Sequence, residues 1–326
     1  MLSWRNASRT SASSPGSPSA SGPARDPTAS RPASGPSWRT WLLAARPVTL
    51  TAAVTPVLVG TAAAVHVGRF AALPFVAAVC AAMLIQIGTN LANDVFDFEK
   101  GADTTRRLGP PRVTQAGLVS ARRVRAAMLA SFGLAAAVGL YLVVVGGWPI
   151  LAAGVLSIAA GMAYTGGPWP LGYHGLGDVL VFVFFGLVAV LGSYYLQVGG
   201  LSPMALAAAV IVGLPVTAIL VVNNLRDLDT DRQAGKRTLA VRVGARATRI
   251  EYALLVLAPY PLAGVFISAG ILPRACWLLW LALPPTLRVA RPVLEGVQGP
   301  RLNPVLRATA RLHLFCGLLL AAGFVL

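Results

Sequence analysis

The chain has 326 residues, of which 56% are hydrophobic and only 12% are charged, and its mean hydropathy is +0.69. A soluble globular domain carries about 25% charged residues, so this composition excludes an ordinary soluble protein. In a soluble chain the net charge of +16 would indicate a nucleic-acid-binding protein, but here it predicts basic loops beside a lipid bilayer, and we expect no nucleic-acid partner.

Residues 1–38 are rich in Ser, Pro, Ala and Arg and contain a single acidic residue, Asp26. They include no apolar segment of the kind that a secretory signal requires, and we expect a disordered N-terminal tail. An Arg- and Ser-rich leader with few acids is also typical of organelle transit peptides, so an organelle membrane stays open beside the expected bacterial cell membrane. We expect residues 39–326 to form one intramembrane domain.

From residue 41 onward, apolar runs of about 18–24 residues recur, each long enough to cross a hydrocarbon core of about 30 Å. Helices satisfy their own backbone hydrogen bonds in lipid, so the sequence predicts an all-α, polytopic membrane protein with nine transmembrane helices around a central cavity. The predicted spans are 43–66, 71–95, 122–145, 148–165, 176–198, 203–225, 248–270, 272–290 and 306–326.

Two long polar loops separate these spans, at about 96–121 and 226–247. If the N-terminal tail lies in the cytoplasm and each span crosses once, every Lys and Arg except Arg69 and Arg274 falls on the cytoplasmic side or at a span end next to it. Cytoplasmic segments carry an excess of Lys and Arg, so this distribution favours nine spans and predicts that the N-terminus and both polar loops are cytoplasmic.

Each polar loop follows a span that ends in Asn and Asp residues, NLANDVFD at 90–97 and NNLRDLDTD at 223–231. At about 100° per residue, Asn and Asp residues of each stretch share one face of a helix. The first face holds Asn90, Asp94 and Asp97, and the second holds Asn223, Asp227 and Asp231. Mg²⁺ takes carboxylate and amide oxygens together with substrate phosphate, so two facing stripes predict a site for two Mg²⁺ ions.

Basic residues surround both acidic stretches. Ion pairing on a cytoplasmic loop would explain Glu99, Asp229 and Arg107, but it does not require Asn and Asp on one face in both halves. We therefore expect bases to bind the phosphate oxygens that the metals leave free. At a membrane surface this combination indicates a diphosphate with a lipid tail, although a glycerol- or sugar-type diphosphate would satisfy the same ligands. The candidate contacts for diphosphate or a substrate carboxylate are Lys100, Arg106, Arg112, Lys236 and Arg237.

The paired motifs Asn90-x-x-x-Asp94-x-x-Asp97 and Asp227-x-x-x-Asp231 resemble those of the UbiA superfamily of intramembrane prenyltransferases. Three longer stretches are similar to its 1,4-dihydroxy-2-naphthoate polyprenyltransferase branch, which acts in menaquinone biosynthesis. They are GADTTRRLGPPRVTQAGLVS (101–120), YTGGPWPLGYHGLGD (164–178) and NNLRDLDTDRQAGKRTLAVRVG (223–244). The resemblance implies transfer of a polyprenyl group from its diphosphate to the naphthoate ring, which loses its carboxylate and gives demethylmenaquinol or demethylmenaquinone.

The resemblance also implies roles for single residues. Asn90, Asp94 and Asp97 would hold one Mg²⁺, and Asp227 and Asp231, with Asn223 or Asn224, would hold the other. Asp103 begins a loop segment that we expect to contact substrate. Tyr164 would help to bind the diphosphate, but the lysine that the superfamily often has four residues later is Pro168 here, so an ordinary interfacial tyrosine stays open.

Two other functions stay open. A sibling enzyme of the superfamily would prenylate 4-hydroxybenzoate or another acceptor. An ion-coupled transporter would also carry intramembrane acids, but a transporter should place them near the midplane on broken helices, whereas these acids lie at helix ends.

Overall fold

The structure is a computed structural model that describes residues 36–102 and 108–326. Within those ranges every regular element is a helix, which confirms the predicted all-α class. The elements are α1 (Trp38–Ala45), α2 (Pro47–His66), α3 (Ala72–Glu99), α4 (Ala121–Gly146), α5 (Trp148–Ala163), η1 (Leu171–His174), α6 (Gly177–Val181), η2 (Phe182–Val188), α7 (Ala189–Val198), α8 (Pro203–Gln233), α9 (Leu239–Leu257), α10 (Pro259–Ser268), η3 (Arg274–Ala282), α11 (Leu283–Leu294), η4 (Gly299–Leu302) and α12 (Asn303–Val325).

Seven helical segments are long and apolar enough to cross a membrane, as an integral multi-pass protein requires. They are Pro47–His66, Ala72–Glu99, Ala121–Gly146, Gly177–Val198, Pro203–Gln233, Leu239–Ser268 and Gly299–Val325. The two other predicted spans, 148–165 and 272–290, are also helical, but α5 has only 16 residues and the second span begins as the 3₁₀ helix η3 before it continues as α11. The number of nine crossings therefore stays a prediction.

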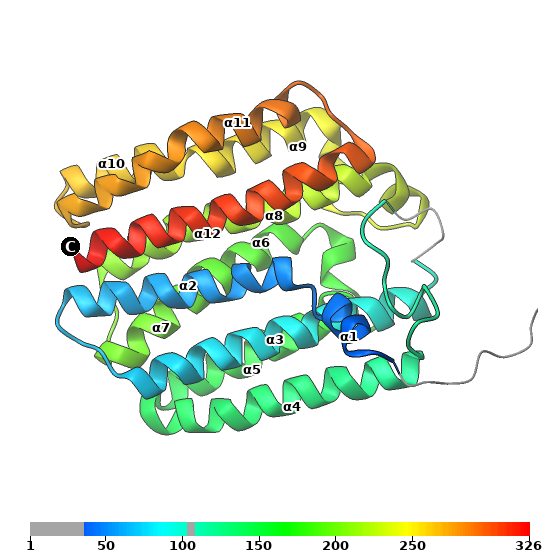
Figure 1. Cartoon of the computed structure of the whole chain (residues 1–326), viewed down its shortest axis with the longest axis horizontal. Coiled ribbons are helices and arrows are strands. Elements are labelled where there is room, and N and C mark those ends of the chain that lie inside the picture. The colour runs from blue at the N-terminus through cyan, green and yellow to red at the C-terminus, as the bar shows by residue number, and fades with distance from the viewer. Residues whose placement is uncertain (1–35, 103–107) are drawn as a thin grey trace, which may run out of the picture. The chain divides into compact units, whose positions relative to one another are not determined.

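The long helices lie side by side with their axes along a common direction (Figure 1). The helix α8 contacts α9, η2, α12 and α2, and α2 also contacts α12, α7 and α3. The most apolar part of α8 is 72% buried and that of α2 is 61% buried, whereas α3 and α4 are each only 28% buried. The interior of the bundle is therefore built on α8 and α2, whereas most residues of α3 are buried or half-buried and many residues of α4 are exposed.

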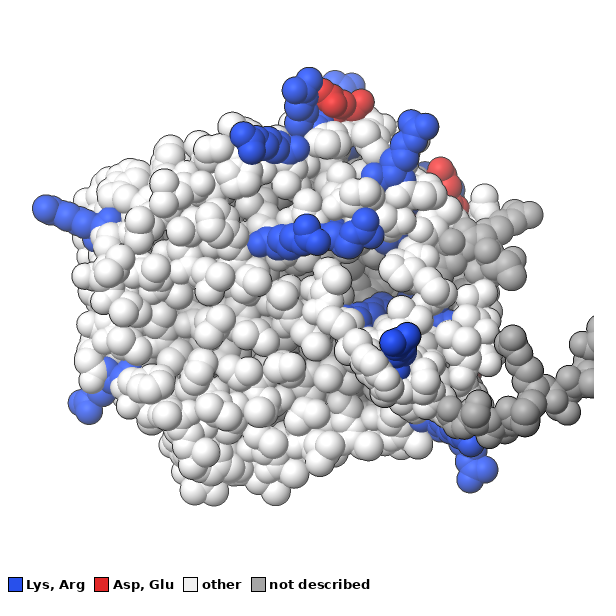
Figure 2. Space-filling model, in the orientation of Figure 1, with Lys and Arg blue, Asp and Glu red and all other residues white. Residues whose placement is uncertain are grey.

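Charge is unevenly distributed over the surface. Figure 2 shows most Lys and Arg side chains over the upper and right-hand parts of the view, with a few at the left-hand edge, while most of the remaining surface is uncharged. The segments before α4 and after α8 lie at the same right-hand end in Figure 1. A broad uncharged belt with basic residues near one end is the surface that a bilayer and its headgroups would cover.

The helices that carry the acidic stretches are longer than predicted. α3 continues to Glu99 and α8 continues to Gln233, so both stretches lie on helices and their side chains follow helical spacing. The first predicted span, 43–66, is in contrast divided between α1 and α2. Arg46 at the junction has a φ of 53°, and Pro47 begins α2, because the residue before a proline avoids the helical conformation.

Close packing of η2 against α8 depends on two glycines. A Cβ atom built on Gly186 would lie 2.7 Å from the Cα of Gly213, and a Cβ on Gly213 would lie 2.8 Å from the Phe182 ring. Neither position has room for a side chain, so the two helices approach as closely as their backbones permit.

We expect the substitution Gly186→Leu to push η2 away from α8 and to lower the free energy of unfolding by about 1–3 kcal/mol, the usual cost of an overfilled core. Thermal unfolding in detergent measures the loss. Gly133→Leu on α4 is the matched control, since nothing lies within 4 Å of a Cβ built there. Equal melting temperatures for the two variants would contradict the close approach.

Candidate active site

A cavity of about 500 Å³ lies at the ends of α3 and α8, where both acidic stretches meet. Its polar lining comes from segments far apart in the sequence. It consists chiefly of Asn93, Asp97, Arg112, Tyr164, Thr165, Tyr173, Asn223, Asn224, Asp227, Asp231 and Lys236. Carboxylates, amides and cations thus share one enclosed space, as the sequence predicts for a diphosphate site.

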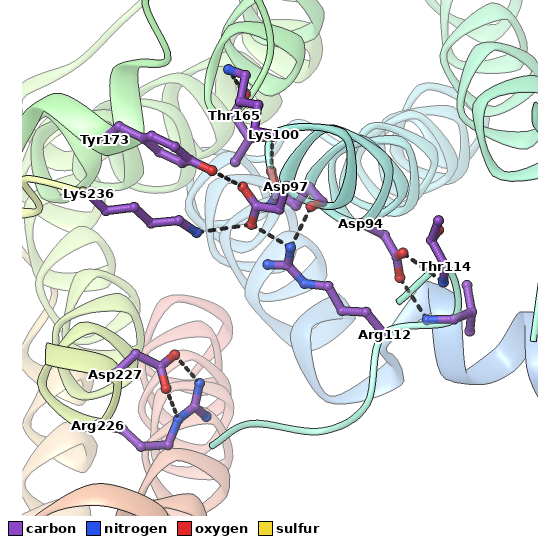
Figure 3. A network of polar contacts seen from close by, with 12 residues as sticks. Asp94, Asp97, Lys100, Arg112, Thr114, Thr165, Tyr173, Arg226, Asp227 and Lys236 are labelled. Atoms are coloured by element: carbon purple, nitrogen blue, oxygen red, sulfur yellow. Dashed lines mark hydrogen bonds and ion pairs between the residues drawn. The ribbon is translucent and has the colours of Figure 1, made fainter. Parts of the chain in front are cut away.

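Asp97 is bonded to three side chains from three segments (Figure 3). Its carboxylate is 1% exposed and accepts hydrogen bonds from the Arg112 guanidinium, the Tyr173 hydroxyl and the Lys236 ammonium group, the last at 3.2 Å. These contacts draw the segment before α4, the helix η1 and the segment after α8 together around the end of α3. In this arrangement one buried carboxylate pairs with two cations and offsets the charge of only one, so a substrate phosphate could also bind them.

On the facing helix, Arg226 organises the second acidic stretch. Its guanidinium donates to both carboxylate oxygens of Asp227, and it also donates to the side-chain oxygens of Asn223 and Asn303, at 2.9 Å each. The Asn303 amide in turn donates to the backbone carbonyl of Leu108 at 3.0 Å. Arg226 therefore links α8 to the last helix and to the segment before α4.

Asp231 lies one helical turn beyond Asp227 and also lines the cavity. Among the described residues, no ion pair or side-chain hydrogen bond engages its carboxylate. Its oxygens are therefore available to a ligand in a way that those of Asp97 and Asp227 are not, because these two are already paired with cations.

Asn90 and Asp94 do not line the cavity. Of the three residues on the predicted first face, only Asp97 does. Asn90 donates to a carbonyl and a hydroxyl group at the junction of α1 and α2, at 2.9 Å each. Asp94 accepts the backbone N–H groups of Val113 and Thr114, at 3.0 Å each, and points away from the cluster around Asp97 (Figure 3). The metal-binding role predicted for this pair is not supported by their positions, because helical spacing alone cannot tell which of two adjoining faces meets the cavity.

Asn93 is the residue that the sequence prediction missed on this helix. It lies one turn before Asp97 on the same face and lines the cavity with it. Its side-chain oxygen accepts the Thr165 hydroxyl at 2.9 Å, and its backbone carbonyl accepts Arg112 at 2.6 Å. The signal was present in NLANDVFD as an Asn four residues before an Asp.

Tyr173 was missed as well. It lies on η1, a single 3₁₀ turn without periodicity, so no pattern distinguished it from its neighbours. Its ring lies beside two cations, with the Nζ atom of Lys236 4.7 Å and that of Lys100 5.4 Å from the ring centroid. The ring can therefore make cation–π contacts with both ammonium groups while its hydroxyl donates to Asp97.

Lys100 and Arg237 lie outside the cavity lining. Lys100 donates to the carbonyls of Thr165 and Gly167, at 2.6 and 3.0 Å, and so holds the segment after α5 against the end of α3. Partial burial lowers the pKa of Lys100, Asp97 opposes that shift, and Lys236 adds to it. The side chain of Arg237 is exposed.

Tyr164 does line the cavity. Its hydroxyl group can donate a hydrogen bond to a ligand in the cavity. The other two predicted contacts, Asp103 and Arg106, lie outside the described residues, as does most of the predicted N-terminal tail.

The cavity can supply oxygen ligands to a metal in two groups, one from Asn93 and Asp97 and the other from Asn223, Asp227 and Asp231. Within residues 36–102 and 108–326, no three His, Cys, Asp or Glu side chains lie close enough to bind a metal by themselves. Mg²⁺ commonly takes one or two carboxylates and completes its shell with water and substrate phosphate, so these residues fit such an ion.

A second cavity, of about 310 Å³, lies among α2, α3, α4, α5 and α7 and is lined almost wholly by apolar side chains. It shares Gln86, Tyr164, Val181 and Phe185 with the polar cavity. The two spaces therefore adjoin, with the charged groups at one end and an apolar recess at the other.

Comparison with known proteins gives a consistent result. The model of the UbiA prenyltransferase family matches residues 53–296, which confirms the resemblance seen in the motifs. A 1,4-dihydroxy-2-naphthoate octaprenyltransferase of Mycobacterium tuberculosis is 40% identical over 288 residues, 88% of this chain and 97% of that protein. The protein of the same name from Escherichia coli is 38% identical over 294 residues, 88% of this chain and 95% of that protein.

Solved structures show the same fold. The apo structure of a UbiA homolog from Aeropyrum pernix has a TM-score of 0.64 at 17% identity and covers 84% of this chain and 96% of its own. A UbiA homolog from Archaeoglobus fulgidus bound to GPP and Mg²⁺ has a TM-score of 0.60 at 15% identity and covers 87% of this chain and 99% of its own.

Proposed function

Since the chain belongs to the UbiA prenyltransferase family, we propose that it is a 1,4-dihydroxy-2-naphthoate polyprenyltransferase of menaquinone biosynthesis. It transfers a polyprenyl group from polyprenyl diphosphate to the naphthoate ring. Besides the relatives of that name, the proposal rests on the adjoining cavities, one polar and one apolar. A polyprenyl diphosphate has the same two parts, a charged head and a long hydrocarbon tail.

The diphosphate head fits the polar cavity. Arg112 and Lys236 both point into it and now pair with Asp97. Phosphate oxygens would compete for these cations and form charge-assisted hydrogen bonds with them, and the protonated Tyr164 hydroxyl would donate another. The prenyl tail would lie in the apolar cavity, with Gln86 and Phe185 at the passage between the two.

We propose two Mg²⁺ ions in this cavity. Asn93 and Asp97 would hold one, in place of Asn90 and Asp94, and Asp227 and Asp231 with Asn223 would hold the other. Bound there, Mg²⁺ neutralises charge on the diphosphate as the leaving group departs. A solved homolog from Archaeoglobus fulgidus that contains GPP and Mg²⁺ supports the metal in this fold.

Two bonds break and one C–C bond forms in the reaction. The allylic C–O bond breaks and the diphosphate leaves with its electron pair, and the electron-rich ring donates a pair to form a C–C bond to the allylic carbon. The bond between the ring and its carboxylate then breaks, CO₂ leaves, and the electron pair of that bond returns to the ring. Arg112 and Lys236 stabilise the negative charge that grows on the leaving group. The apolar lining beyond Tyr164 keeps the allylic carbon in a space with few groups that could hold water.

We further propose nine membrane crossings with the active-site end in the cytoplasm. Seven segments have the length and apolar character to cross, and α5 and residues 274–294 would add the other two. This count keeps nearly all Lys and Arg on one side, as the positive-inside rule requires. The relatives from bacteria support a bacterial cell membrane as the location.

The acceptor assay tests the proposal. Membranes that contain the protein are expected to consume 1,4-dihydroxy-2-naphthoate with a polyprenyl diphosphate and to release CO₂, whereas 4-hydroxybenzoate is turned over at least about tenfold more slowly, because the contacts of one acceptor are not available to the other. Release of label from an acceptor with a radiolabelled carboxylate measures the loss of CO₂, and chromatography of the products measures prenyl transfer to each acceptor. Equal turnover of 4-hydroxybenzoate would reassign the protein to a sibling activity, and membranes without the protein are the control.

A further inference from the structure

We propose that Asp94 is a positioning residue, which fixes the segment 108–114 so that Arg112 enters the cavity. We call 108–114 the anchored segment. The proposal rests on the proposed function for the role of Arg112 toward a diphosphate. It gives the buried carboxylate of Asp94 a task other than metal binding.

The contacts of Asp94 carry the proposal. Its side chain is 2% exposed, and each carboxylate oxygen accepts one backbone N–H of the anchored segment, that of Val113 on one oxygen and that of Thr114 on the other, at 3.0 Å each. Val113 is itself fully buried in a cluster of apolar side chains around α3 and α4. A carboxylate that binds two successive backbone N–H groups fixes the direction of the chain at that point, which one contact would not do.

The hydrogen bonds of Asp94 determine where Arg112 lies. It directly precedes the two bonded N–H groups, and its guanidinium donates to the carboxylate of Asp97 and to the carbonyl of Asn93. Asp94 and Asp97 lie on adjoining faces of α3, so one helix holds both the backbone and the side chain of the segment. Because α3 is a continuous helix, it sets the distance between the backbone contact at Asp94 and the side-chain contact at Asp97.

The other end of the anchored segment, at Leu108, is held by a separate hydrogen bond. The Asn303 side chain donates to the Leu108 carbonyl at 3.0 Å and accepts from Arg226 at 2.9 Å. Figure 3 shows Arg226 and Asp227 on the opposite side of the cavity from Asp94, with Arg112 between them. The anchored segment thus passes from the α8 side to the α3 side of the cavity, held at each end by a side chain that lies outside the polar lining.

Asp94→Asn tests the proposal, because it keeps the shape of the side chain but replaces one acceptor oxygen with an NH₂ group. In wild-type protein without substrate, the amide hydrogens of Val113 and Thr114 are expected to exchange slowly with deuterium. In the variant, peptides that cover these residues should exchange about tenfold faster or more, as a lost buried hydrogen bond implies, while peptides from α12 are unchanged. Unchanged exchange at 113–114 would overturn the proposal, and this reading does not depend on which acceptor the enzyme uses.

Enzyme kinetics distinguish a positioning residue from a metal ligand. Asp94→Asn should lower kcat/KM by about ten- to a hundredfold, and the Mg²⁺ concentration for half-maximal activity should stay the same. In the Arg112→Gln background, Asp94→Asn should have less than about a twofold further effect, because the two residues act as one unit. Additive losses together with a raised Mg²⁺ requirement would instead make Asp94 a metal ligand.

Glu99→Gln is the matched control. It is the same carboxylate-to-amide change on the same helix, but Glu99 is 36% exposed and, among the described residues, pairs with Arg125 at the surface. We expect neither the exchange at 113–114 nor kcat/KM to change in this variant. A loss equal to that of Asp94→Asn would show that any acid on α3 gives the effect and would overturn the specific role.

Discussion

Replacing Asp231 with Ala is expected to lower turnover by on the order of a thousandfold, because the substitution removes a carboxylate that would hold the Mg²⁺ needed to offset charge on the leaving diphosphate. Asp231 has the one cavity carboxylate that no other described side chain engages, so its loss leaves no buried cation unpaired. The protein should therefore stay folded in the membrane. Turnover of dihydroxynaphthoate in membranes with equal amounts of protein measures the effect.

Asp229→Ala is the control for this prediction. Asp229 lies on the same helix two residues earlier, but its side chain is 79% exposed and makes a 3.6 Å ion pair with Arg232 at the surface. Isolated surface ion pairs contribute about 0–1 kcal/mol, so this variant should keep wild-type turnover. Near-normal turnover in Asp231→Ala would refute the assignment of α8 to a metal site.

Removal of Mg²⁺ by a chelator is expected to abolish prenyl transfer, and added Mg²⁺ should restore it. Asp97 and Asp227 already offset the charge of Arg112 and Arg226, and the carboxylate of Asp231, which no described side chain engages, adds negative charge, so the departing diphosphate needs added cations. The chain's own Arg112 and Lys236 supply only part of the positive charge that the reaction needs.

The chelator experiment needs a control for damage to the protein. Thermal unfolding in detergent should show that the chelated protein stays folded, since the described helices pack through apolar clusters that contain no metal ligand set. Full activity in chelator would contradict metal dependence, whereas activity that returns with Ca²⁺ as well as with Mg²⁺ would show a metal site without size selectivity.

The helices could be predicted from the sequence because lipid demands long apolar segments with internal hydrogen bonds, and seven of the predicted spans are such helices. The junction at Arg46 was harder to see, since a positive φ in a non-glycine residue leaves no mark in hydropathy. The predicted span 148–165, in contrast, begins where α5 begins and ends within two residues of its end.

The site could be predicted in part. Asp97, Asp227 and Asp231 line one cavity because each lies near the end of a helix whose spacing could be counted. Whether Asn90 or Asn93 lines the cavity depends on which face of α3 is turned toward it. That orientation is set by the packing of α3 against other helices and cannot be read from helical spacing. Tyr173 and Asn303 join the site through a 3₁₀ turn and through the last helix, and neither contact follows from local pattern.

The contacts of Asn303 have a consequence for how the enzyme is made. Membrane helices are synthesised from the N-terminus, so α3 and α8 are complete before α12 emerges from the ribosome. Asn303, the first residue of α12, is bonded both to Arg226 and to the segment that carries Arg112. A growing chain therefore completes both acidic stretches before Asn303 can link Arg226 to the segment that carries Arg112.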